Sequence, residues 1–96
     1  MIDEKRKHER FPLTQAIELT TDDGSVLSAN GINISESGIL FQTDAEIARD
    51  VKVVFQLQVP MGKSVITVGC EGVVVRCLSL SGKYHVAIKL TDQEFV

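Results

Sequence analysis

The chain has 96 residues, of which 44% are hydrophobic and 24% are charged, and these values are typical of one small soluble domain. A chain of this length buries one modest core, which leaves little room for an enclosed catalytic chamber. Its net charge of −3 argues against a general nucleic-acid binder, because such domains are strongly basic.

The positive charge is concentrated at the beginning of the chain, where residues 5–10 carry +3 and the rest therefore carries −6. We expect residues 1–12 to form a flexible basic arm. Its charges are unlike the apolar stretch of a secretory signal, and no apolar run of the sequence has the length of a membrane span. A cytoplasmic protein is therefore expected.

The next part of the chain, residues 13–90, is dominated by alternation of apolar and polar residues, which indicates strands with one buried face. The predicted strands cover residues 13–19, 26–34, 39–43, 51–59, 65–80 and 84–90. The apolar phase of the long fifth strand shifts around Gly69 and Gly72, which predicts a bulge or bend there. Six strands at short spacing with scarcely any helical periodicity predict an all-β fold, a small antiparallel barrel or sandwich.

Residues 91–96 are expected to form a C-terminal tail. The sequence from Thr91 to Glu94 has the form of a capping box, which starts helices. We therefore expect at most one short helical turn after the last strand.

Cysteine and histidine usage predicts neither a disulfide nor a metal site. Cys70 and Cys77 lie on one predicted strand, about 23 Å apart, whereas disulfide partners need Cα atoms within about 7 Å. Both are expected to be free thiols. The two histidines, His8 and His85, belong to no metal-ligand motif.

The sequence also offers no catalytic motif. Gly62-Lys63-Ser64 resembles the end of a phosphate-binding loop, but Leu57 occupies the position of the required first glycine, so we interpret the segment as a hairpin turn. No nucleophile has a recognisable motif around it. We therefore predict no catalytic residue, no cofactor and no enzymatic activity.

Two short segments carry a more specific signal. Arg6 and Arg10 lie four apart in the basic arm, and Asn33, Ser35 and Gly38 form the pattern Asn-x-Ser-x-x-Gly at a predicted turn. Each pattern alone is usually a solvated charged face or an ordinary turn. Together, in this order, they resemble the signature of the PilZ domain family, Arg-x-x-x-Arg followed by Asp/Asn-x-Ser-x-x-Gly. The resemblance extends to the long strand at residues 71–76 and the closing strand at residues 85–90.

The resemblance implies a single domain with a six-stranded antiparallel barrel at residues 13–90 that binds cyclic di-GMP. Arginine forks suit this ligand because they engage guanine bidentately and clamp phosphates. Asn33 and Ser35 would hydrogen-bond guanine or phosphate, and Gly38 would permit a tight turn and close approach of the ligand. Lys5, Lys7 and His8 are secondary candidates, whereas Arg76 is expected to be an ordinary strand-surface residue.

The resemblance further implies that the bound ligand orders the basic arm against the barrel and changes a surface read by a protein partner. The partner is unidentified; the family's association is with motility, biofilm and polysaccharide control. We expect a monomer or weak homodimer. Two alternatives remain: a PilZ-like adaptor that binds protein without nucleotide, and a small oligonucleotide-binding barrel, which would normally display more stacking aromatic residues than this chain has.

Overall fold

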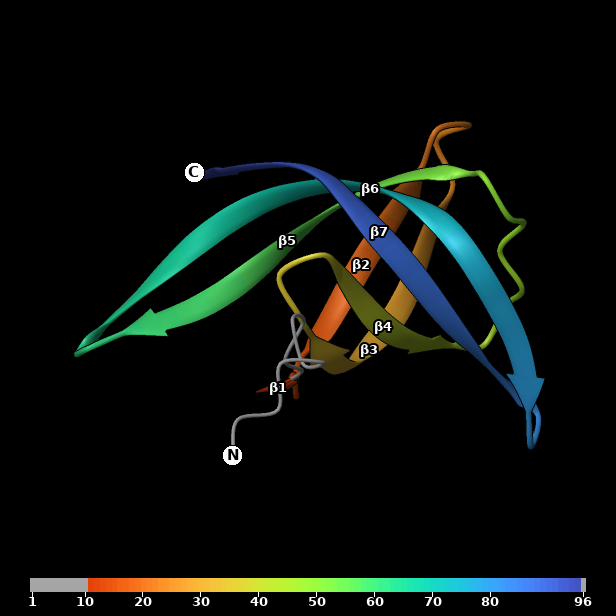
Figure 1. The fold of residues 1–96 in the computed structure, drawn as a ribbon, viewed down its shortest axis with the longest axis horizontal. Helices are drawn as coiled ribbons and strands as arrows, with labels where there is room; N and C mark the ends of the chain where they lie inside the picture. Colours follow the sequence, from red (N-terminus) through yellow and green to blue (C-terminus); the bar gives the residue numbers. More distant parts are fainter. Residues whose placement is uncertain (1–10, 96) are drawn as a thin grey trace, which may run out of the picture.

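The computed structural model describes residues 11–95, and within this range the chain forms seven β-strands and no helix (Figure 1). The strands are β1 (Phe11–Pro12), β2 (Ala16–Thr21), β3 (Val26–Ile34), β4 (Gly38–Thr43), β5 (Lys52–Met61), β6 (Ser64–Leu80) and β7 (Lys83–Phe95). Six of them follow one another in the order β3-β2-β5-β6-β7-β4, and pairing of β4 with β3 closes the ring. The predicted six-stranded antiparallel barrel is confirmed.

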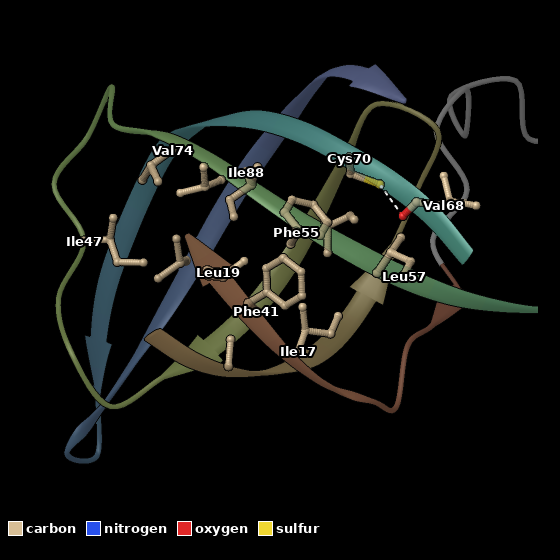
Figure 2. Packing of buried hydrophobic residues seen from close by; sticks show 14 residues of the cluster. Ile17, Leu19, Phe41, Ile47, Phe55, Leu57, Val68, Cys70, Val74 and Ile88 are labelled. Carbon is tan, nitrogen blue, oxygen red and sulfur yellow. Dashed lines mark hydrogen bonds between the residues drawn. The ribbon is translucent and has the colours of Figure 1, made fainter. Parts of the chain in front are cut away.

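Every second side chain along a strand points into the barrel, and these inward side chains are mostly apolar. In β5, for example, Val53, Phe55 and Leu57 are buried between exposed residues. The rings of Phe41 and Phe55 meet edge to face at the centre of the core, with centroids 5.2 Å apart (Figure 2). Ile47, in the loop between β4 and β5, is also buried in this cluster. The core therefore contains a side chain from a loop as well as side chains from the strands.

The two longest hairpins extend the sheet to opposite sides of the view in Figure 1. In the β5–β6 hairpin, Gly62 has a positive φ of 62° and the register runs to Met61↔Ser64. This confirms the hairpin turn interpreted from the sequence. Both cysteines lie on β6 and both are free, as predicted.

The last strand is longer than the sequence predicts. Residues 91–95, expected as a C-terminal tail, are the last part of β7, and residues 92–95 pair with residues 68–71 of β6. The long β6 offers an edge with which these residues form ladder hydrogen bonds, and this overrides the local capping-box pattern. The irregularity of β6 lies beyond the predicted Gly69 and Gly72: its extra residue is Val75, between Val74 and Arg76, whereas the register shift at Glu71/Gly72 is caused by the extra residue Thr91 of β7.

Candidate functional site

Three of the residues predicted for the site lie together at the turn between β3 and β4. The Ser35 amide donates to the Gly38 carbonyl oxygen at 2.9 Å, and the Ser35 hydroxyl lies 3.4 Å from the same oxygen. Ser35 is only 4% exposed, whereas Glu36 and Ser37 at the tip are exposed. In this structure, Ser35 holds the turn closed, and its predicted contact with a ligand stays a prediction.

A bulge in β3 determines which way Asn33 faces. Gly31 pairs with the buried Phe41, but Asn33 pairs with Leu40, so Ile32 is an extra residue between them. Without it, strict alternation would place Asn33 on the inner face with Gly31. The extra residue moves Asn33 to the outer face of the barrel, which is how bulges commonly re-aim a side chain.

The last two residues of the predicted basic arm form β1, and they run along β3 beside this motif together with the segment that follows them. β1 pairs with β3 through Phe11↔Ile34 and Pro12↔Asn33, and the Leu13 amide donates to the Ile32 carbonyl oxygen at 3.0 Å. The residue at which the described chain begins is therefore one pair away from Asn33. Arg6 and Arg10, and the secondary candidates Lys5, Lys7 and His8, lie outside the described residues.

Gly38 has a packing reason for being glycine. It pairs with Lys89 of β7, and a Cβ added to Gly38 would lie 2.6 Å from the carbonyl oxygen of Ile88. Gly72 of β6 approaches the same stretch from the other side, because its Cβ would lie 2.7 Å from the Lys89 carbonyl oxygen. The two glycines thus allow β7 to pass closely between β4 and β6. The predicted close approach of a ligand at Gly38 stays a prediction.

The sequence analysis missed one cation of this surface. Lys89 is exposed and lies opposite Gly38 in the β4–β7 ladder. Its distance of 51 positions from Gly38 hides the relation, and only the pairing of β4 with β7 shows it. Arg76 is also exposed and faces Ala87, two strands from Asn33's partner Leu40, in keeping with its prediction as a strand-surface residue.

Among residues 11–95, no group of three or more His, Cys, Asp or Glu side chains is arranged to hold a metal ion. His85, the one histidine in that range, is half-buried on β7, with its Nε2 3.5 Å from the side-chain nitrogen of Gln42. The part of the chain that the structure describes contains no helix of the length and apolar composition needed to cross a membrane.

Comparison with known proteins adds a family and a fold. A family model described as "PilZ domain" matches residues 4–95, while the search of curated proteins found no match. Among solved structures, the chain is similar to the inhibitor of motility MotI/DgrA from Bacillus subtilis, with a TM-score of 0.76 and 15% identity. The likeness covers 91% of this chain but 43% of that one. This chain therefore spans less than half of that neighbour, and the two share a fold.

Proposed function

Because the chain belongs to the PilZ domain family, we propose that it is a receptor for cyclic di-GMP. In this proposal the ligand lies on the outer face of the barrel beside the β3–β4 turn. Its binding residues are Arg6, Arg10, Asn33, Ser35 and Gly38. The family is one of ligand-binding receptors rather than enzymes, which is consistent with the predicted lack of catalysis.

The observation that supports the proposal best is the position of β1. Arg10 is bonded to Phe11, and Phe11 pairs with Ile34, the residue after Asn33. Successive Cα atoms lie about 3.8 Å apart and paired Cα atoms about 5 Å apart. Covalent geometry therefore keeps Arg10, 23 positions before Asn33 in the sequence, within reach of a dinucleotide bound beside Asn33.

The chemistry of the neighbouring groups suits such a ligand. Arginine forks can take guanine edges or phosphates in bidentate pairs. Asn33 faces outward and carries both a donor and an acceptor for a guanine edge. Lys89, across from Gly38, adds a cation near the expected phosphates. The acidic remainder of the chain disfavours extended polyanions at the same place.

Calorimetric titration of the purified protein with cyclic di-GMP tests the proposal. We expect binding at micromolar ligand, and Arg10→Ala should weaken it by about 2 kcal/mol or more, roughly thirtyfold, because buried charge-assisted bonds are costly to lose. Arg76→Ala is the matched control, since it removes an exposed arginine that lies three strands away from Asn33. Absence of heat in the native protein would refute the proposal, and equal affinities in the two variants would show that Arg10 is not a clamp.

Binding experiments with the same purified protein distinguish the two alternative functions. A small oligonucleotide-binding barrel would release cyclic di-GMP in competition with single-stranded RNA, and an adaptor without nucleotide would bind neither. We further propose that ordering of the basic arm changes the surface presented to a protein partner. Control of motility is the first process to test for such a partner, because the structural neighbour is an inhibitor of motility.

A further inference from the structure

Gln15 directly precedes β2, and its side chain bonds to β5, a strand with which β2 shares only a short ladder. Its Nε2 donates to the Gln58 carbonyl oxygen at 3.0 Å, and its Oε1 accepts from the Gln58 amide at 3.0 Å. These are the two bonds that a paired strand residue would form. The Gln15 carboxamide therefore occupies the place of a strand neighbour on the edge of β5; we call this pair of bonds the Gln15 clasp.

The Gln15 clasp lies where the barrel has an open seam. β2 and β5 pair at only two positions, Thr20↔Val54 and Thr21↔Val53. Between these pairs and the clasp the strands diverge around a hollow of about 410 Å³, lined by residues that include Ile17, Glu18 and Gln56. Few other bonds therefore hold β5 to β2, and the clasp is the connection at the far end of the seam.

Gln15 also belongs, through its backbone, to the segment that leads out of the basic arm. The Gly31 amide donates to the Gln15 carbonyl oxygen at 2.9 Å, so the residue is attached to β3 by its main chain and to β5 by its side chain. Gly31 lacks a Cβ that would lie 2.7 Å from the Leu13 carbonyl oxygen, which lets residues 13–15 lie flat on β3. A shift of this segment along β3 must therefore act on Gln58.

Beyond Gln58 the connection continues into the β5–β6 hairpin. The Thr67 hydroxyl of β6 donates to the Gln58 side-chain oxygen at 3.2 Å. The hairpin tip displays two large apolar side chains, Met61 at 57% and Val65 at 62% exposure. Gln58 and Thr67 thus belong to the hairpin whose exposed apolar tip lies to one side of the barrel (Figure 1).

We propose that Gln15 is a positioning residue that couples residues 11–15, beside the β3–β4 turn, to the β5–β6 hairpin. A ligand bound at that turn restrains residues 11–15 and tightens the Gln15 clasp, and the clasp restrains Gln58 and the hairpin beyond it. The inference rests on the proposed function, because cyclic di-GMP is the ligand proposed for that turn. It assigns the regulation of that site to a hydrogen-bonded pair remote from the ligand.

The clasp itself is tested without ligand, by hydrogen exchange of single amides followed by NMR. The Gln58 amide donates to Gln15, so Gln15→Ala should speed its exchange about fivefold, the factor that corresponds to one typical net hydrogen bond. Gln15→Glu, which keeps the acceptor but loses the donor, should give a smaller effect and provides a second variant should the alanine variant fold poorly. Gln56→Ala, a matched glutamine on β5, should leave Gln58 unchanged. Unchanged Gln58 exchange in both Gln15 variants overturns the inference.

The coupling is tested by repeating the measurement with cyclic di-GMP and by calorimetry. We expect the ligand to slow Gln58 exchange at least fivefold in the native protein and not in Gln15→Ala. Coupling is reciprocal, so the affinity of Gln15→Ala should fall by the same factor by which the ligand slows that exchange. Binding to the native protein with no effect on Gln58 would overturn the inference and leave the proposed function standing. If calorimetry detects no binding of cyclic di-GMP to the native protein, both the inference and the proposed function are overturned.

Discussion

The packing of Gly38 against β7 makes a quantitative prediction about the site motif. In Gly38→Ala the new Cβ would lie 2.6 Å from the Ile88 carbonyl oxygen, whereas ordinary contact begins at 3.4 Å. The atom it meets belongs to a backbone that is held in the β4–β7 ladder, so it cannot rotate away as the end of a side chain could. The two strands would have to separate by roughly 0.8 Å, the difference between those distances, at the end of six paired positions.

The cost of this separation follows from known overpacking effects. Extra methyl groups forced into packed regions cost typically 1 to 3 kcal/mol, and the smaller entropy of an unfolded alanine chain returns only about 0.4 to 1 kcal/mol. We expect a net loss of about 1 to 2 kcal/mol. In a domain of this size, 1 kcal/mol corresponds to roughly 4 to 8 °C, so the melting temperature should fall by about 4 to 16 °C.

Thermal unfolding followed by circular dichroism, in the absence of ligand, measures this fall. Ser37→Ala, in the same turn but exposed, is the control and should change stability by less than about 0.5 kcal/mol. A Gly38→Ala protein that melts within about 2 °C of the native protein but no longer binds cyclic di-GMP would refute the packing argument. The glycine would then serve the approach of the ligand, as the sequence motif alone suggests.

Three further predictions concern the barrel. Ile47→Ala, in the β4–β5 loop, should cost about 2 to 4 kcal/mol in urea unfolding despite its loop position, because its side chain is only 4% exposed in the core. Ser81→Asn should stabilise the β6–β7 turn by about 0.5 kcal/mol in the same assay, because residue 81 has a φ of 52° before a glycine, as Asn-Gly turns prefer. At pH 8 a thiol reagent should modify the half-buried Cys77 well before Cys70, whose pKa is raised by burial; equal rates, measured by mass spectrometry, would contradict this.

The sequence predicts the strands well because their signals are local. Alternation of apolar and polar residues marks the core face of β5 directly, and the turn residues at Gly62 and Gly82 have the positive φ that hairpins require. It predicts the end of β7 wrongly because that signal is not local: residues 91–95 form a strand only because β6 lies beside them. Local capping chemistry at Thr91 cannot compete with a ladder whose other half is 20 or more positions away.

The features of the candidate site also differ in whether their sequence signals are local. Asn33, Ser35 and Gly38 are close in sequence, so their grouping at one turn could be predicted. The outward direction of Asn33 could not, because it depends on the extra residue Ile32 between two pairs with β4. Lys89 was missed for a related reason, since it reaches the site only through the pairing of β4 with β7. A motif therefore identifies the turn, and the ladder around it decides what faces a ligand.

The β3–β4 turn is attached to the extended part of the sheet by more than one route. The Leu90 amide of β7 donates to the Ser37 carbonyl oxygen at 3.1 Å, at the position where β7 leaves β4 and continues beside β6 alone. The Gln15 clasp reaches β5 from the other side of β3. One attachment ends on β7 and the other on β5, two of the strands that extend beyond the barrel. We therefore expect ordering at the turn to be communicated to these strands through such bonds between neighbouring strands.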